Sequence, residues 1–246
     1  MNKEQIVVVN NVKYLIKNSK DLIENTLMKG NQWNNDVVLL IGLLIKKLNL
    51  KHFINIGSHI GTVALPISMY VEKVTVFEPF PPTFEHFMEH IKLNKIKNID
   101  SYNLALGDRE TKVYFPGTNH ERFKNNSGGI PAITDDDIKK NRLSSNFYSK
   151  EYDSTMKKFD DLAVEKFDIM LIDAEGREYE IIKGGAKKIS QNKPIIIVEI
   201  WDDKKRKFEN MTTKKEDVIL YMEYLGYKLS KKISDDYIFF PKNLKI

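Results

Sequence analysis

The sequence has 246 residues, of which 41% are hydrophobic and 30% are charged, with a net charge of +5 and no cysteine. This length fits one α/β domain, and the apolar content is sufficient for a large core, which excludes a disordered chain. The lack of cysteine excludes disulfides, zinc-thiolate sites, iron–sulfur clusters and cysteine nucleophiles.

The apolar segments alternate between strand-like and helix-like patterns after an N-terminal extension, residues 1–35. In chain order the sequence predicts helix Asn34–Leu48, strand His52–Ile56, helix Gly61–Tyr70, strand Lys73–Phe77, helix Pro82–Asn94, strands Asp100–Asn103 and Asp168–Ile172, helix Glu178–Ser190, strand Pro194–Ile200 and helix Thr213–Leu225. Continuously apolar strands predict a parallel sheet with helices on both faces. Right-handed crossovers then place the carboxyl ends of the strands at one edge, where ligands bind.

Two segments depart from this alternation. Gly226–Leu229 and Tyr237–Phe240 are too close in sequence to be parallel neighbours, so they predict an antiparallel hairpin that closes the sheet. Residues 116–158 are polar with little periodicity, which predicts a lid or substrate-binding insertion. We expect a single domain over residues 1–246.

Location and partners are constrained by charge and hydropathy. The longest apolar run, Val37 to Ile45, is about half of the ~20 residues that a membrane span needs. The N-terminus also lacks the apolar region of a signal peptide, so we expect a cytoplasmic protein. The positive charge is mostly lysine spread along the chain, which indicates solvated faces rather than a nucleic-acid surface.

The first motif is a glycine turn directly after the strand that ends at Ile56. Gly57 and Gly61 stand at the two ends of a Gly-Ser-His-Ile-Gly run, where glycine lets the backbone approach a ligand at a helix N-terminus. The run lacks the full G-x-G-x-x-G and P-loop patterns, which argues against NAD and nucleoside triphosphate sites. A plain tight turn also explains it.

The second motif is Glu78, which follows the next strand. An acid in this place can accept hydrogen bonds from both ribose hydroxyls of an adenosyl ligand, with Phe80 packed on the adenine. The alternative is that Glu78 caps the following helix.

The third motif is a pair of carboxylates, Asp173 and Glu175, after the strand Asp168–Ile172. At this spacing both can point into one crevice, where one removes a proton from a substrate hydroxyl and the other positions the ligand. Glu199 lies at the same edge. The alternative is a capping cluster for the helix that begins near Arg177.

Two other patterns imitate metal sites. His86 and His90 form an H-x-x-E-H pattern, and we interpret them as surface histidines because their helix lies away from the predicted active edge. Asp135–Asp137 follow Thr134, as expected of acids at a capped helix N-terminus. We therefore assign no metal ligand.

These motifs, together with the runs Asn103–Leu106 and Ser127–Gly129, resemble the FkbM family of S-adenosylmethionine-dependent methyltransferases over most of the chain. The most specific part is the run Asp173–Glu178 followed by Lys183-Gly184. The resemblance implies an α/β class I methyltransferase (Rossmann-like) fold: a three-layer sandwich whose mostly parallel seven-stranded sheet ends in an antiparallel hairpin. It also implies S-adenosylmethionine as cofactor and O-methylation of a hydroxyl on a sugar, glycan or other small-molecule acceptor.

Site residues follow from the motifs and the resemblance together. Asp173 and Glu175 are the catalytic candidates, and the cofactor candidates are Asn55, Gly57, Ser58, His59, Gly61, Glu78, Pro79, Phe80, Leu106 and Asp173. The family usually has Asp at the position of Asn55 and Lys at that of Leu171. Two alternatives stay open: a metal-dependent glycosyltransferase with Asp173-Ala174-Glu175 as its nucleotide-sugar site, and a non-catalytic adenosyl- or RNA-binding protein.

Overall fold

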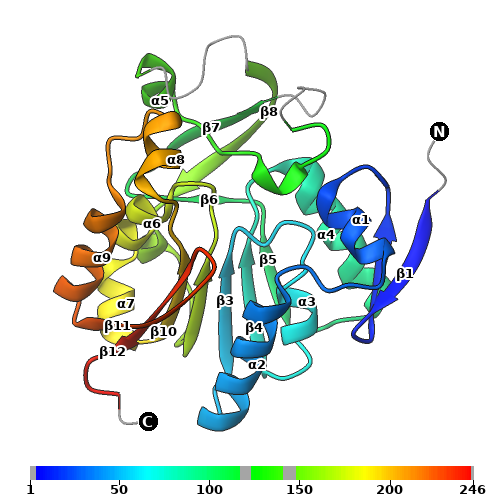
Figure 1. The fold of residues 1–246 in the computed structure, drawn as a ribbon, viewed down its shortest axis with the longest axis horizontal. Helices are drawn as coiled ribbons and strands as arrows, with labels where there is room; N and C mark the ends of the chain where they lie inside the picture. The colour runs from blue at the N-terminus through cyan, green and yellow to red at the C-terminus, as the bar shows by residue number, and fades with distance from the viewer. Residues whose placement is uncertain (1–3, 117–122, 141–147, 245–246) are drawn as a thin grey trace.

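The computed structural model describes residues 4–116, 123–140 and 148–244. Its centre is a seven-stranded sheet in the order β11-β12-β10-β9-β3-β4-β5 (Figure 1). The parallel strands are β3 (His52–Ile56), β4 (Lys73–Phe77), β5 (Ile99–Tyr102), β9 (Ile169–Ile172) and β10 (Ile195–Glu199). An antiparallel hairpin of β11 (Tyr227–Ile233) and β12 (Asp236–Pro241) closes one side. The predicted sheet is therefore confirmed.

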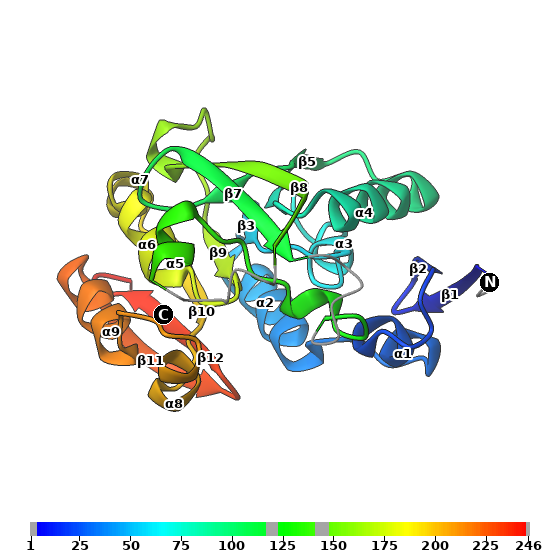
Figure 2. The ribbon, with the colours of Figure 1, turned by 90° about the horizontal axis from the view of Figure 1, so that it is seen from above.

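Helices cover both faces of the sheet and complete the predicted three-layer sandwich (Figure 2). One face packs against α2 (Asn35–Leu48), α3 (Ala64–Ile67) and α4 (Pro81–Asn94), and the other against α6 (Glu178–Gly184), α7 (Ala186–Asn192) and α9 (Lys215–Tyr224). Successive strand residues serve opposite faces, so Phe53 belongs to the first core and Ile54 to the second. Strands β3, β9 and β10 lie between the two cores, which explains their continuous apolar runs.

The N-terminal extension is a β-hairpin followed by a short helix. Its elements are β1 (Gln5–Val9), β2 (Val12–Ile16) and α1 (Leu22–Met28). Asn10 and Asn11 turn the hairpin with φ angles of 50° and 66°, which asparagine tolerates well in a two-residue turn. The hairpin packs on α4 through β2.

The expected surface position of His86 and His90 is wrong. The two side chains are only 6% and 0% exposed, because the hairpin covers this side of α4. Leu15 donates its backbone N–H to Nε2 of His90 over 2.9 Å, and Nε2 of His86 lies 2.7 Å from the carbonyl oxygen of Leu15. Burial lowers the pKa of both imidazoles. They are structural links between α4 and the hairpin.

Part of residues 116–158 is regular structure rather than the irregular loop that we expected. β8 (Tyr148–Lys157) pairs with β7 (Thr111–Pro116) and β6 (Ala105–Leu106) in a small separate sheet. The sequence did not predict β8, because its residues are polar and strand formation depends strongly on the pairing context. The segment also holds η1 (Ser127–Gly129) and α5 (Asp135–Lys139), which Thr134 caps as predicted. Residues 117–122 and 141–147 lie outside the described part.

Two predicted helices are shorter than expected. α3 covers only part of Gly61–Tyr70, because Gly61 has a φ of 89°, outside the helical region. Pro66 lies in the first turn of α3, where proline is tolerated. The predicted helix Glu178–Ser190 divides into α6 and α7 at Gly185. The remaining short elements are η3 (Phe159–Asp161) and α8 (Asp203–Phe208).

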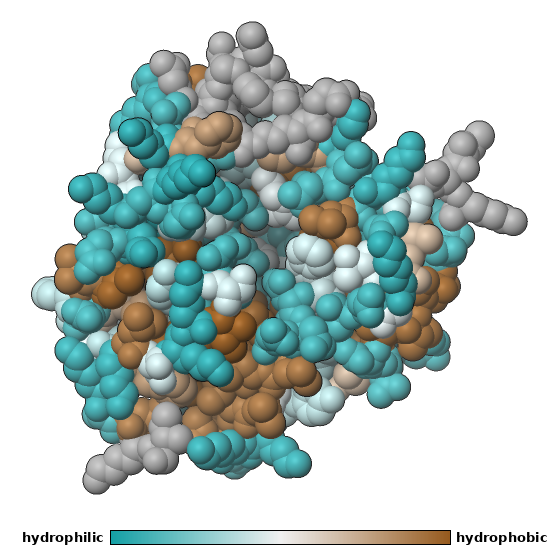
Figure 3. All heavy atoms as spheres, in the orientation of Figure 1, coloured by the Kyte–Doolittle hydropathy of each residue, from teal (hydrophilic) through white to brown (hydrophobic). Residues whose placement is uncertain are grey.

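The surface carries some exposed apolar side chains away from the carboxyl edge of the sheet. Leu39 and Leu43 of α2 are 56% and 67% exposed, and Figure 3 shows apolar surface in the lower region where α2 lies. Within the described residues, no helix combines the length and the apolar character needed to cross a bilayer.

Candidate functional site

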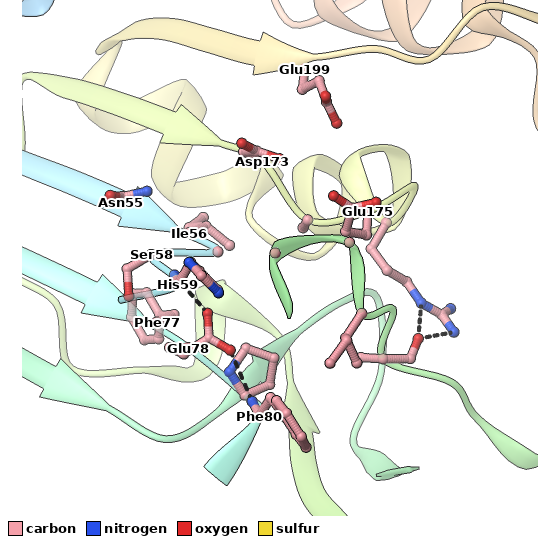
Figure 4. Close-up of a pocket in the computed structure, with 18 of the residues that line it drawn as sticks. Asn55, Ile56, Ser58, His59, Phe77, Glu78, Phe80, Asp173, Glu175 and Glu199 are labelled. Carbon is pink, nitrogen blue, oxygen red and sulfur yellow. Dashed lines mark hydrogen bonds between the residues drawn. The ribbon is translucent and has the colours of Figure 1, made fainter. Parts of the chain in front are cut away.

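A pocket opens at the carboxyl ends of β3, β4, β9 and β10 (Figure 4). Of the predicted site residues, it is lined by Asn55, Gly57, Ser58, His59, Glu78, Pro79, Phe80, Leu106, Asp173 and Glu175, whereas Gly61 is not among the lining residues. The other lining segments include Leu22 and Ile23 of α1, Trp33, and residues 126–130, which belong to the predicted lid or substrate-binding insertion. The pocket therefore combines the predicted edge of the sheet with a cover from distant parts of the chain.

The glycines of the turn are explained by packing within the protein. Gly57 has a φ of 77°, and a Cβ there would lie 1.7 Å from the carbonyl oxygen of Asp173. A Cβ on Gly61, with a φ of 89°, would lie 2.3 Å from the ring of Phe87. Such distances exclude any side chain. Approach of a ligand to the opposite side of this backbone stays a prediction.

Glu78 is buried at the end of β4 and is fixed by two backbone groups. Its Oε2 accepts the N–H of His59 over 2.8 Å, and its Oε1 accepts the N–H of Phe80 over 3.0 Å (Figure 4). Burial raises the pKa of this carboxyl to about 7, although both hydrogen bonds lower it. The capping alternative is wrong, because α4 begins with Pro81 and has no side-chain cap.

Three carboxylates meet on the other side of the pocket. Asp173, Glu175 and Glu199 each bring one oxygen to within 4.8 Å of the others. Burial is the main cause that raises the pKa of all three, to about 8 for Glu175 and about 9 for Glu199, and mutual repulsion raises it further. A cluster of this kind either holds protons at neutral pH or is neutralised by a positively charged ligand.

The same three carboxylates could serve as hard oxygen ligands for a divalent cation. Sequence analysis assigned no metal ligand. It placed Glu199 at the same edge of the sheet as Asp173 and Glu175, without a role in a metal site. Two neighbouring groups compete with a cation: Nε1 of Trp201 donates to Glu199 over 2.8 Å, and the charge of Lys205 lowers the pKa of the cluster. The geometry permits a cation without requiring one.

Glu178 stabilises the turn that carries Asp173 and Glu175 by accepting hydrogen bonds from its backbone. Oε1 of Glu178 accepts the N–H of Gly176 over 2.9 Å and that of Ala174 over 3.3 Å. Its Oε2 lies 3.6 Å from Nη2 of the buried Arg206. Glu175 itself has a φ of 51°, which is a left-handed backbone conformation that residues other than glycine adopt uncommonly.

The alternative that Asp173 or Glu175 caps α6 is wrong. The N-cap residue is Arg177, and the helix has no side-chain cap. Arg177 instead donates through Nε and Nη2 to the carbonyl oxygen of Ala132 and pairs with Asp137. It therefore ties the carboxylate turn to the segment that covers the pocket.

Several buried polar atoms in the pocket wall lack a partner among the described residues. They are both amide atoms of Asn55, Oγ of Ser58 and Nδ1 of His59. Leaving such groups without hydrogen bonds is costly, so native proteins usually satisfy them. The wall is suited to a ligand with several polar groups.

Comparisons with known proteins agree with this architecture. A model of the FkbM methyltransferase domain matches residues 55–229. Among solved structures the chain is similar to methyltransferase FkbM from Methylobacillus flagellatus KT, with a TM-score of 0.51, 14% identity, and coverage of 78% of this chain and 44% of that chain. It is also similar to the tRNA (uracil-54, C5)-methyltransferase of Pyrococcus abyssi in complex with S-adenosyl-L-homocysteine, with a TM-score of 0.49, 10% identity, and coverage of 97% and 44%.

The chain spans less than half the length of these two proteins. At 14% identity, the similarity to the protein from Methylobacillus flagellatus shows the fold alone. No protein of curated function matches the sequence significantly.

Proposed function

We propose that this chain, which belongs to the FkbM methyltransferase family because that domain matches residues 55–229, binds S-adenosylmethionine and methylates a hydroxyl oxygen. The acceptor in this proposal is a small molecule or a glycan. The finer claims, namely the cofactor, the acceptor and the residue roles, rest on the pocket at the carboxyl edge of the sheet.

The observation that carries the proposal is the set of polar atoms in that pocket. Asn55, Ser58 and His59 contribute buried atoms without partners, and Glu78 lies across from the carboxylate cluster. S-adenosylmethionine has hydroxyl, ammonium and carboxylate groups, which match a wall of donors and acceptors. The residues present therefore fit this cofactor.

Glu78 is proposed to bind the ribose. Each of its carboxylate oxygens already accepts one backbone N–H and retains a further lone pair for a ribose hydroxyl. Phe80 and Leu106 offer apolar surface beside it for the adenine. The amino-acid end of the cofactor then extends toward the glycine turn and the carboxylates.

Asp173 and Glu175 are proposed to act on the acceptor. S-adenosylmethionine supplies a methyl group on a positively charged sulfur. This positive charge favours ionised carboxylates, which lowers the raised pKa of the cluster. An ionised Asp173 or Glu175 can then remove the proton of the acceptor hydroxyl while the site holds the oxygen in line with the methyl group.

The acceptor class is inferred from the same carboxylates. Ionised Asp173, Glu175 and Glu199 accept hydrogen bonds and donate none, so they suit a ligand with several hydroxyl groups. A sugar or glycan presents hydroxyls in this way. The negative cluster also disfavours a phosphate-rich acceptor such as a nucleic acid.

Calorimetric titration tests the proposal. We expect S-adenosylhomocysteine to bind the wild type without added metal. Glu78→Ala should weaken this binding about tenfold or more, because charged hydrogen bonds are lost. Asp173→Asn should still bind S-adenosylhomocysteine. Asp173→Asn should also stop the release of S-adenosylhomocysteine from S-adenosylmethionine when sugars are supplied. Binding of a sugar nucleotide that depends on Mn²⁺, with no binding of S-adenosylhomocysteine, would instead establish the glycosyltransferase alternative.

A further inference from the structure

Three side chains from separate parts of the sequence form a hydrogen-bonded chain, and two of them, His59 and Ser127, line the pocket. Nε2 of His59 lies 2.9 Å from Oγ of Ser127, and that oxygen lies 2.8 Å from Oδ2 of Asp21. Asp21 is the N-cap of α1, Ser127 begins η1, and His59 lies in the glycine turn. The N-terminal extension, which lies outside the matched family domain, is thereby connected to the predicted cofactor site.

The direction of each hydrogen bond follows from the donors and acceptors present. Oδ1 of Asp21 accepts the N–H groups of Ile23 and Glu24, and Oδ2 accepts the backbone N–H of Ser127. Since a carboxylate only accepts, the hydroxyl of Ser127 donates its proton to Asp21. Its oxygen is then the acceptor for His59, so Nε2 of His59 carries the proton and Nδ1 keeps a lone pair.

The environment keeps this imidazole neutral. Burial lowers the pKa of His59 to about 4, with Asp21 raising it and His90 lowering it further. Nδ1 is buried and finds no donor in the part of the chain that the structure describes, while His59 lines the pocket. Such a lone pair is an acceptor that a bound ligand can satisfy.

Hydrogen bonds hold both the backbone and the imidazole ring of His59. Its backbone N–H donates to Glu78, the residue proposed to bind ribose, and its ring is held by Ser127. Of the donors on the proposed cofactor, the ribose hydroxyls are matched by Glu78. The ammonium of the amino-acid end is the remaining strong donor on that side.

We propose that Nδ1 of His59 accepts a hydrogen bond from the ammonium of the cofactor, and that Ser127 and Asp21 hold the ring in the tautomer this bond requires. The inference rests on the proposed function for the identity of the ligand, whereas the tautomer is a property of the free protein. His59 is a binding residue in this scheme, and Ser127 and Asp21 are positioning residues.

Two ligands separate the amino-acid end from the rest of the cofactor in a calorimetric test. S-adenosylhomocysteine carries the ammonium, and 5′-methylthioadenosine lacks the amino-acid end. We expect His59→Ala and Ser127→Ala to weaken the binding of S-adenosylhomocysteine about tenfold, which is the effect of one buried hydrogen bond. The affinity for 5′-methylthioadenosine should stay unchanged. His59→Asn should recover part of the loss, because its Oδ1 can take the place of Nδ1.

Ser68→Ala is the matched control, since Oγ of Ser68 is also buried but donates to the carbonyl oxygen of Leu65 within its own turn. Thermal unfolding of each variant shows whether the fold is kept. Equal losses for both ligands, or no loss for either, in folded His59→Ala would overturn the assignment.

The ring nitrogens can be examined directly by long-range ¹H–¹⁵N NMR of the ligand-free protein. We expect the Nε2–H tautomer for His59 in the wild type and a loss of this preference in Ser127→Ala. Observation of the Nδ1–H tautomer in the wild type would contradict the inference. If the tautomer is as expected but S-adenosylhomocysteine does not bind, the proposed function fails, and the assignment of the ammonium fails with it.

Discussion

Asn55 of β3 and Leu171 of β9 are register partners on neighbouring parallel strands. They are 1% and 2% exposed, and both line the pocket. These are the positions at which the family usually has Asp and Lys. The two positions at which the sequence departs from the expected family pattern are therefore neighbours in the sheet.

This pairing predicts a strong coupling between the two positions. Asn55→Asp alone, or Leu171→Lys alone, buries a charge without a partner and should lower the free energy of unfolding by about 3 kcal/mol. In the double variant the charges can pair, so the total loss should be smaller than the sum by about 1–3 kcal/mol. Urea denaturation of the four proteins measures the coupling, and strictly additive losses would show that the two side chains do not interact.

Gly57 should be intolerant of any side chain for a reason internal to the fold. In Gly57→Ala the new Cβ meets the carbonyl oxygen of Asp173 at a φ of 77°, so we expect a loss of about 3 kcal/mol or more in unfolding free energy. Gly42→Ala is the control, because Gly42 lies within α2 with no atom near a new Cβ. It should stabilise the protein by about 0.5–1 kcal/mol. Similar unfolding midpoints for both variants would contradict the packing argument.

The carboxylate cluster predicts how stability depends on pH. The folded-state pKa is about 8 for Glu175 and about 9 for Glu199, against an ordinary value of 4.5. The folded protein therefore binds more protons than the unfolded chain in this window, and stability falls as pH rises from about 4.5 toward 9.

Glu199→Gln removes one of these acids while keeping an acceptor for Trp201. The decrease in melting temperature between pH 6 and pH 9 should be smaller in this variant, by about 2–4 °C if the difference is near 1 kcal/mol. Parallel melting curves for variant and wild type across this range would count against a buried, protonated Glu199.

Glu178 should support the site without touching a ligand. Glu178→Ala removes the acceptor for Gly176 and Ala174 and leaves Arg206 without its carboxylate, with an expected loss of about 3–5 kcal/mol. Glu178→Gln keeps an acceptor oxygen for the turn, so its loss should be clearly smaller. Chemical denaturation distinguishes the two, and equal losses would mean that charge alone matters here.

Glu78 should make cofactor affinity depend on pH. Its pKa is about 7, and the ionised carboxylate is the better acceptor for ribose hydroxyls. Affinity for S-adenosylhomocysteine should therefore rise between pH 6 and pH 8 as this carboxyl loses its proton. Titrations of Glu78→Gln over the same range should show a weaker dependence, and an unchanged dependence would exclude Glu78 as its source.

The sequence alone determined the chain order of the strands and main helices of the central sheet, and the edge at which the motifs gather. Strand and helix periods, turn residues and crossover handedness are local or general properties, so His52–Ile56, the glycine turn and Glu78 could be placed correctly from the chain. The same local signals missed β8, whose polar residues form a strand only because β7 and β6 pair with it.

Only the tertiary structure decided which side chains meet. Glu199 joins Asp173 and Glu175 because β10 lies beside β9 in register, and Asp21 reaches His59 through Ser127 because α1 packs against η1. Likewise His86 and His90 are buried because a hairpin far away in the sequence covers α4. Contacts between distant segments depend on how the elements pack in three dimensions, which a local sequence pattern does not describe.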